Sequence, residues 1–218
     1  MSRTYDQYCP VARALEVVGE RWTLLVAREL LLGPRRFTDL MAGLPGISAN
    51  VLAGRLKDLE QEGMVARRTL PPPAASAVYE LTPEAGGLVG VLAAMAEWGM
   101  SMLDAPRAHD EVRGEWIVLG LVVTARAPDV ADGTTYELHI DGEVLHVQVS
   151  GDNLQPHQGS ADDADAVLTM DATTLADLSG GRLDVEDALA GSRVTVAGDE
   201  DAGRLLLTSF SGLPAGVT

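Results

Sequence analysis

The sequence has a single cysteine, which excludes any disulfide bond within the chain. It has no run of about 18 apolar residues, so no transmembrane helix is expected. The first ten residues, MSRTYDQYCP, are polar, so we expect no signal peptide and a cytoplasmic protein. No HExxH or CxxC pattern, glycine-rich phosphate loop or nucleophile–base pair stands out. We therefore expect no metal, no cofactor and no enzymatic activity.

Basic residues are also scarce, because 16 Lys and Arg stand against 32 Asp and Glu, a net charge of −16. The deficit lies in one part of the chain. Residues 1–73 hold ten Lys and Arg against eight acidic residues, a net of +2, whereas residues 105–218 hold six against twenty, a net of −14. DNA binding needs Lys and Arg to contact phosphates. Only the first part suits that partner, and then through a focused patch.

The stretch from Cys9 to Thr82 carries the pattern of a winged helix-turn-helix. Three short helical patterns each end near a Pro or Gly turn, and a fourth begins after Ser48, a good N-cap. Two β-like runs joined by a proline-rich loop then predict a hairpin. This order of elements places one helix in the DNA major groove. The expected helices are Cys9–Glu20, Trp22–Leu32, Thr38–Met41 and Ala49–Glu62, and the expected strands are Met64–Leu70 and Ala77–Leu81.

The fourth helix is predicted to have two opposite faces. At about 100° per residue, Leu52, Leu56 and Leu59 share the inner face. Asn and Lys on the outer face suit contacts with adenine and guanine, although an ordinary solvated face is the alternative. The cap residue Ser48 is also a candidate for contact with the DNA backbone. The outer face consists of Asn50, Gly54, Lys57 and Gln61.

Arginines near this helix are the candidates for phosphate contact. Arg67 and Arg68 adjoin the loop of the expected hairpin, and Arg35 and Arg36 precede the third helix. Their charge favours phosphate binding, and arginines that merely solvate the surface are the alternative. Arg55 lies between the two faces of the fourth helix, so it braces the fold, contacts phosphate, or does both.

Cys9 is a candidate for redox sensing. Pro10 suits the first helical position, which puts Cys9 at or next to the N-cap. The helix dipole favours a thiolate there. Since no second cysteine exists, a disulfide would have to join two subunits or a small thiol. The alternative is a small buried apolar residue, the ordinary role of a free cysteine.

The remaining sequence predicts a dimer helix, a linker and an α+β domain. Glu84–Leu103 predicts an apolar helix that needs a cover, most simply a second subunit. The polar residues 104–114 predict a linker, and the apolar run after it fits a helix or a strand. Three histidines fall on separate strands without metal-ligand spacing: His139, His146 and His157. The expected strands are Thr135–Ile140, Glu143–Val149, Ala166–Met170 and Arg193–Ala197, and the expected helices are Thr173–Leu178, Val185–Ala190 and Glu200–Phe210.

Two stretches resemble known families. The motifs Cys9-Pro10, ERWTLLVARELLLGPRRFTDL, PGIS-x-N-x-L-x-x-RL-x-x-LE-x-x-G-x-V and YELT, within residues 8–103, resemble the HxlR family of winged-helix transcriptional regulators. This resemblance implies repression, and a cysteine at the place of Cys9 that often senses oxidants or electrophiles. Residues 164–210, with the phrase GRL…ALAGSRVTVAGD, are similar to the sterol-carrier-protein type-two fold. That similarity implies an apolar cavity for a hydrophobic molecule, whose lining residues the sequence does not identify.

The sequence thus predicts an α+β protein in which a winged helix-turn-helix domain precedes a sterol-carrier-like domain. The boundaries are 1–103 for DNA binding and dimerisation, 104–114 for the linker and 115–218 for the ligand-binding domain. We expect a homodimer that binds a pseudo-palindromic operator in double-stranded DNA and senses a hydrophobic small molecule. Two alternatives are a redox-responsive regulator that acts through Cys9, and a lipid-binding protein that uses the winged helix only for assembly.

Overall fold

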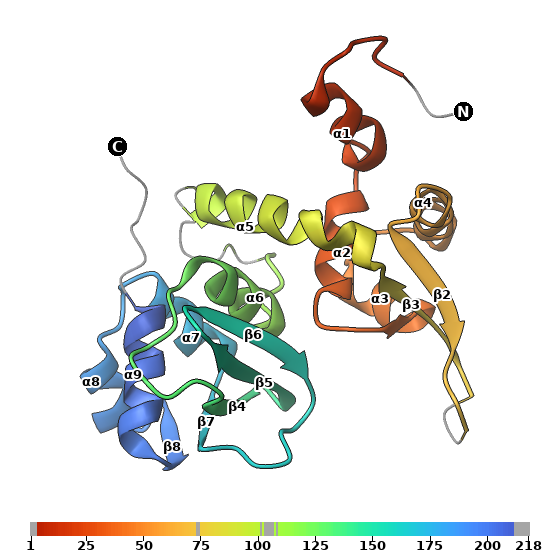
Figure 1. The fold of residues 1–218 in the computed structure, drawn as a ribbon. Helices are drawn as coiled ribbons and strands as arrows, with labels where there is room; N and C mark the ends of the chain where they lie inside the picture. Colours follow the sequence, from red (N-terminus) through yellow and green to blue (C-terminus); the bar gives the residue numbers. More distant parts are fainter. Residues whose placement is uncertain (1–3, 73–74, 101, 103–106, 108, 212–218) are drawn as a thin grey trace. The chain divides into compact units, whose positions relative to one another are not determined.

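A computed structural model describes residues 4–72, 75–100, 102, 107 and 109–211. The chain folds as two compact units, residues 1–92 and 93–218 (Figure 1). The boundary between them falls inside helix α5 (Gly87–Met100). Residues 104–106 and 108 of the expected linker lie outside the described residues.

The N-terminal unit has the expected winged helix-turn-helix order. Helices lead into a β-hairpin, and a two-residue strand pairs with the hairpin to give the sheet order β1-β3-β2 (Figure 1). All these strands pair antiparallel. The elements are α1 (Pro10–Val18), α2 (Thr23–Leu30), β1 (Arg35–Arg36), α3 (Phe37–Gly43), α4 (Ala49–Gln61), β2 (Val65–Thr69) and β3 (Ala77–Leu81).

Local signals place the ends of α4 where the sequence predicts them. The Ser48 side-chain oxygen accepts a hydrogen bond from the Val51 backbone N–H (3.4 Å) and caps the helix. Gly63 has φ +71°, a conformation that glycine adopts without strain, and it ends the helical run. The leucines of the inner face are at most 1% exposed and pack with residues of α2, α3 and β2. This core holds α4 in place.

Three parts of the N-terminal unit differ from the sequence expectation. Helix α3 begins at Phe37 rather than Thr38, because Asp39 Oδ2 accepts from the Arg36 backbone N–H (3.1 Å) and forms a capping box with it. Strand β1 is not predicted at all, since two residues carry no periodicity. The expected helix from Glu84 is instead a 3₁₀ turn, η1 (Pro83–Gly86), followed by α5.

The C-terminal unit combines helices with a mixed, mostly antiparallel sheet of order β6-β5-β4-β7-β8. Strands β4 and β7 are parallel, and the other neighbours are antiparallel. The apolar run left open by the sequence is helix α6 (Gly114–Thr124). The other elements are β4 (Thr135–Ile140), β5 (Glu143–Ser150), β6 (Asn153–Gln158), β7 (Ala166–Met170), α7 (Ala172–Ser179), α8 (Val185–Ala190), β8 (Thr195–Gly198) and α9 (Glu200–Phe210).

The hairpin between β4 and β5 turns at Asp141 and Gly142, as their sequence predicts. Both residues have positive φ, +51° and +85°, which suits the right-handed twist of a two-residue hairpin. The carboxylate of Asp141 also accepts the Ala172 backbone N–H (3.0 Å) at the start of α7. The turn therefore sets the strand register and ties the sheet to a helix.

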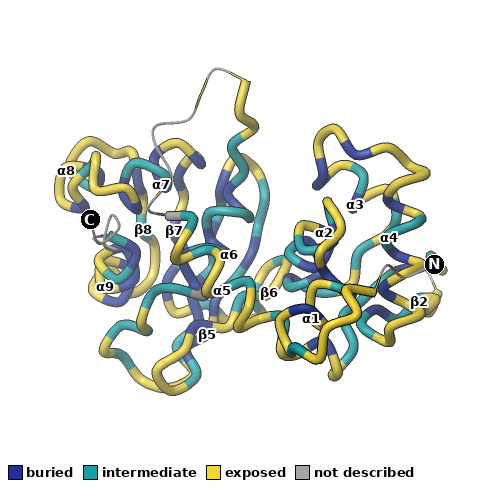
Figure 2. Tube along the Cα trace, turned by 90° about the horizontal axis from the view of Figure 1, so that it is seen from above, coloured by how far each residue is buried: buried dark blue, intermediate teal, exposed yellow. Residues whose placement is uncertain are grey.

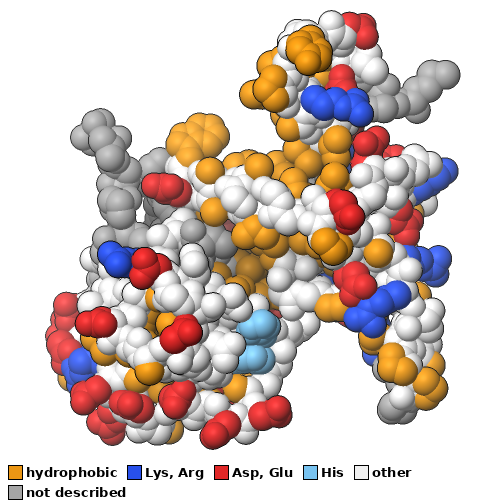
Figure 3. Space-filling view, in the orientation of Figure 1, with side chains coloured by type: hydrophobic (Ala, Val, Ile, Leu, Met, Phe, Trp, Pro, Cys, Tyr) orange, Lys and Arg blue, Asp and Glu red, His pale blue; other side chains and the backbone are white. Residues whose placement is uncertain are grey.

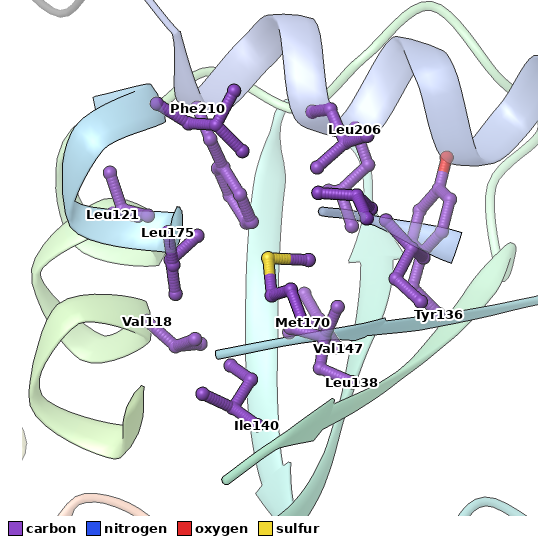
Figure 4. Packing of buried hydrophobic residues seen from close by; sticks show 14 of the residues in the cluster. Val118, Leu121, Tyr136, Leu138, Ile140, Val147, Met170, Leu175, Leu206 and Phe210 are labelled. Atoms are coloured by element: carbon purple, nitrogen blue, oxygen red, sulfur yellow. The ribbon is translucent and has the colours of Figure 1, made fainter. Parts of the chain in front are cut away.

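The core of the C-terminal unit lies between one face of the sheet and the helices α6, α7 and α9. Figure 4 shows Val118 and Leu121 from α6 and Leu206 and Phe210 from α9 pointing toward residues of the strands. Alternation along each strand selects the inward residues. On β4 and β5 these are Tyr136, Leu138, Ile140, Leu145, Val147 and Val149, each at most 3% exposed.

None of the helices in the described residues is long and apolar enough to cross a membrane.

Candidate nucleic-acid interface

The outer face of α4 is open to a ligand. Asn50, Lys57 and Gln61 are exposed, and Gly54 is partly exposed, while the leucines opposite are buried (Figure 2). A rigid helix with buried leucines behind it presents these side chains at fixed spacing. A Cβ added at Gly54 would meet no atom within 4 Å, so the protein itself does not require glycine there. The absence of a side chain lowers this part of the face and permits close approach of a partner.

Arg55 braces the fold. Its Nη1 lies 3.7 Å from Glu20 Oε2, and its Nη2 lies 3.4 Å from Asp58 Oδ2, with 22% of the side chain exposed. Glu20 precedes α2, so this pair links α4 to the first helices of the unit. The sequence left open whether Arg55 stabilises the fold or contacts phosphate, and the structure shows ion pairs that suit the first role.

The arginines of the hairpin point to opposite sides of the sheet. In the β2–β3 register Arg67 faces Tyr79 and Arg68 faces Val78, and successive residues of a strand alternate between faces. The Arg67 guanidinium lies 5.9 Å from the centre of the Tyr79 ring. The Arg68 Nε donates to Glu80 Oε2 at 2.8 Å, so a carboxylate already offsets the charge of Arg68.

Strand β1 brings its two arginines to the same sheet. Arg35 faces Tyr79 and is partly buried, whereas Arg36 faces Val78 and is exposed. The Arg36 Nε donates to the Ser76 hydroxyl at 3.0 Å. Arg36 and Arg68 therefore share one side of the sheet, and Arg35 and Arg67 share the other. The sequence analysis predicts neither the pairing of these arginines by side of the sheet nor the contacts of Tyr79 and Glu80. The alternation of side chains along Tyr79-Glu80-Leu81 is the sequence signal that places Tyr79 and Glu80 on opposite sides.

The charges differ between the units as the sequence counts predict. Figure 3 shows Lys and Arg side chains on the part of the N-terminal unit that carries α4, β2 and β3. Asp and Glu side chains gather over the C-terminal unit. Lys and Arg side chains near α4 and the hairpin favour a polyanion there.

Helices α1 and α5 expose apolar side chains. On α1, Val11 is 64% and Leu15 43% exposed, and the preceding Tyr8 is exposed as well. Along α5 the described side chains are all exposed or only partly buried, although Glu97 is the one charged residue of the helix. Exposed apolar faces of this length are typical of protein interfaces. The exposed apolar residues of α5 are Val89, Val91, Met95 and Trp98.

Cys9 is the N-cap residue of α1, as its neighbour Pro10 predicts. Its thiol is free and partly buried, and its side chain makes no capping hydrogen bond.

Two histidines on separate strands, as the sequence predicts, are neighbours on the sheet face opposite the core, a contact that the sequence does not predict. His146 and His157 are direct partners on β5 and β6, and their rings stack with centres 5.0 Å apart. Partial burial and the charge of His146 lower the pKa of His157. On β4, the His139 ring contacts Glu137 at 2.5 Å, and this hydrogen bond lowers the pKa of Glu137. Among the described residues no group of three or more His, Cys, Asp or Glu has the geometry of a metal site.

Two buried hydroxyls of the C-terminal unit, on Tyr136 and Thr174, lack a hydrogen-bond partner among the described residues. Tyr136 is fully buried, and its hydroxyl has no hydrogen-bond partner among the described residues. Burial, together with the charges of Asp165 and Asp199, raises the pKa of Tyr136 to about 12. The Tyr136 hydroxyl is therefore a neutral donor in a core that is mostly apolar.

The fold and this surface define the class of winged helix-turn-helix proteins with an added α+β domain. The HxlR-like helix-turn-helix family matches residues 17–107, and the SCP-2 sterol transfer family matches residues 126–206. The chain belongs to the HxlR-like helix-turn-helix family and carries an SCP-2 domain behind it.

The relatives match less than half of this chain. YvaP of Bacillus subtilis (strain 168), an uncharacterized HTH-type transcriptional regulator, is 34% identical over 100 residues, which are 45% of this chain and 93% of YvaP. The HTH-type transcriptional regulator YodB of the same organism is 37% identical over 91 residues, 41% of this chain and 81% of YodB. The solved structure of the reduced form of YodB is 33% identical, with a TM-score of 0.40, and covers 46% of this chain and 100% of YodB.

Proposed function

We propose that this protein is a dimeric, DNA-binding transcriptional regulator of the HxlR type, which acts in the cytoplasm. The observation that carries the proposal is the open polar face of α4, backed by buried leucines and flanked by the arginines of β1 and β2. Its family supports this role, since the relatives are named as HTH-type transcriptional regulators.

Each residue of the surface has a distinct role in the proposal. Asn50, Lys57 and Gln61 read base edges in the major groove, and Gly54 lets the helix approach. Ser48 caps α4 and touches the backbone. Phosphates are bound by the arginines, with Arg67 foremost because Glu80 holds Arg68 and Glu20 and Asp58 hold Arg55. The full set is Arg35, Arg36, Ser48, Asn50, Gly54, Arg55, Lys57, Gln61, Arg67 and Arg68.

In this proposal the dimer interface consists of exposed apolar residues of α1 and of one face of α5, namely Val11, Leu15, Val91, Met95 and Trp98. A twofold dimer carries two copies of α4, so the operator is pseudo-palindromic, with half-sites about one helical turn apart. Selection of binding sites from random DNA by the full chain tests this directly. Enrichment of an inverted repeat is expected, and loss of enrichment in Asn50→Ala ties the repeat to α4.

The C-terminal domain senses a hydrophobic small molecule in this proposal, and binding of that molecule relieves repression. The match to the SCP-2 sterol transfer family over residues 126–206 supports a ligand of this kind. Native mass spectrometry of the purified protein reports the dimer and any co-purified molecule together. Addition of that molecule must then change operator affinity, and an unchanged affinity argues against sensing. We expect no catalytic turnover.

A second candidate is a regulator that responds to oxidants through Cys9. The partly buried free thiol at the N-cap of α1 favours it, because α1 belongs to the proposed dimer interface. Operator binding that still responds to oxidant in Cys9→Ser contradicts this candidate. A third candidate, a lipid-binding protein that uses the winged helix only for assembly, predicts no sequence-specific shift of DNA in a mobility assay.

A further inference from the structure

A hollow of about 330 Å³ lies within the N-terminal unit, between the residues after α2, the end of β3 and the first turns of α5. Its volume is at the lower end of the range for small-molecule sites, about 300–1,000 Å³. Most of its wall is apolar, including Leu31, Pro34, Leu81 and Val89. The hollow is therefore suited to a small molecule with an apolar body.

Glu80 is the one charged residue among those that line the hollow. Thr82, the other polar side chain in the wall, donates its hydroxyl proton to the Gly63 carbonyl oxygen at 2.6 Å. Glu80 is thus the polar anchor of the site among the residues that line it. A carboxylate beside an apolar wall selects a cation with an apolar body, by charge and by burial of the apolar part.

Glu80 also holds an arginine of the proposed DNA surface. Its Oε2 accepts from Arg68 Nε at 2.8 Å, with 31% of the Glu80 side chain and 45% of the Arg68 side chain exposed. An ion pair this exposed contributes little to stability, so a second cation can replace Arg68 readily. Arg68 and a cation bound in the hollow therefore compete for the Glu80 carboxylate.

We propose that the hollow binds a small organic cation with an apolar body, such as an arylalkylamine, whose ammonium group takes Glu80 from Arg68. Released Arg68 is then available to DNA phosphate. This consequence rests on the proposed DNA-binding function, whereas the ligand site itself does not. All residues that line the hollow belong to the N-terminal unit, so the site adds an input for a ligand of different chemistry from that of the SCP-2 domain.

The first test measures ligand binding to the full chain by titration calorimetry. The probes are 2-phenylethylamine, its neutral isostere 2-phenylethanol and the anion phenylacetate. We expect the amine to bind about twofold to fivefold more tightly than the alcohol, which is the effect of one partly exposed charge pair, and phenylacetate to bind least.

The matched variants are Glu80→Gln and Glu84→Gln. Glu84 is an exposed acidic residue of η1 that is not part of the wall. Glu80→Gln should bind the amine and the alcohol equally, and Glu84→Gln should behave as the natural protein. Equal binding of amine and alcohol by the natural protein, or a preference for the amine that survives in Glu80→Gln, overturns the proposal.

The second test measures operator affinity against salt. The amine should raise affinity severalfold at low salt and steepen the slope of log K against log salt by about 0.9, the value for one further phosphate contact. Glu80→Gln should do the same without the amine. If the amine binds and the slope of log K against log salt does not change, the proposal that Arg68 is released from Glu80 is wrong. If the chain binds no DNA but binds the amine through Glu80, the ligand site stands and the proposed function fails.

Discussion

Helices α5 and α6 have nearly the same composition and opposite surroundings. Each is almost wholly apolar, with one acidic residue, Glu97 in α5 and Glu115 in α6. Helix α6 buries Val118 and Leu121 completely against the sheet, while α5 has no buried side chain among those described. An apolar helix is stable in water only when another surface covers it. The difference therefore shows that α6 completes the core of its own unit, whereas α5 is the helix that we propose for the dimer interface.

Replacing a valine by aspartate in each helix tests this difference. We expect the largest loss of stability in α6. Val118→Asp places a carboxylate at a position with 0% exposure, which we expect to lower the free energy of unfolding by about 4 kcal/mol or more. Thermal and urea unfolding of the C-terminal unit, followed by near-ultraviolet circular dichroism, measures this. A stable, native-like C-terminal unit in Val118→Asp contradicts the burial of α6.

The matched change in α5 is Val91→Asp, at a position that is 43% exposed. We expect the unfolding free energy of the subunit to change by no more than about 0.5 kcal/mol, as for an ordinary surface position. The dimer should dissociate, and operator affinity should fall at least tenfold because each half-site then binds separately. Analytical ultracentrifugation measures the dimer, with Glu97→Gln as the control. A Val91→Asp dimer of unchanged affinity shows that α5 is not the interface.

Gly43 in α3 and Gly54 in α4 differ in the same way, because one is packed against a neighbouring side chain and the other faces open space. A Cβ at Gly43 would overlap the Glu29 carboxylate, so Gly43→Ala should destabilise the N-terminal unit by about 1–3 kcal/mol. A Cβ at Gly54 meets open space, so Gly54→Ala should stabilise the helix by about 0.5–1 kcal/mol. If DNA approaches α4 closely, Gly54→Ala nevertheless weakens operator binding. Denaturant unfolding and a binding titration on both variants measure the two effects, and unchanged operator affinity removes Gly54 from the interface.

The hairpin arginines give a smaller effect. Arg67→Ala should weaken binding to all sequences and reduce the salt slope by about 0.9, the value for one phosphate. Arg68→Ala should reduce the slope less, because Glu80 already holds Arg68. Binding titrations from low to moderate salt measure both slopes. Equal losses in the two variants show that the Glu80 pair does not restrain Arg68.

The smallest effect concerns pH and the stacked histidines. The pKa of His157 is lowered in the folded protein, so the unfolded chain binds its proton first as the pH falls. Stability is then fully present above the unfolded pKa, about 6.5, and decreases slightly below it. His157→Gln should flatten the stability profile between about pH 7 and 5, as measured by urea midpoints. An identical slope in natural protein and variant excludes this contribution.

Short-range patterns predict much of the fold. The cap at Ser48, the leucine face of α4, the hairpin turn at Asp141 and Gly142, and the extent of α9 all follow from signals within a few residues. Partners distant in sequence are not predictable in this way. Arg36 with Ser76, and Arg68 with Glu80, depend on a strand register that no local period specifies.

The sequence by itself determined most of the elements, the winged helix-turn-helix order, the two families and the opposite charges of the two halves. These properties depend on local propensity, periodicity and composition, which need no knowledge of distant contacts. Only the tertiary structure decided which apolar helix is covered, which arginines share a side of the sheet, and that His146 stacks on His157. Burial and register arise from packing between distant segments, so they belong to the folded chain rather than to any part of its sequence.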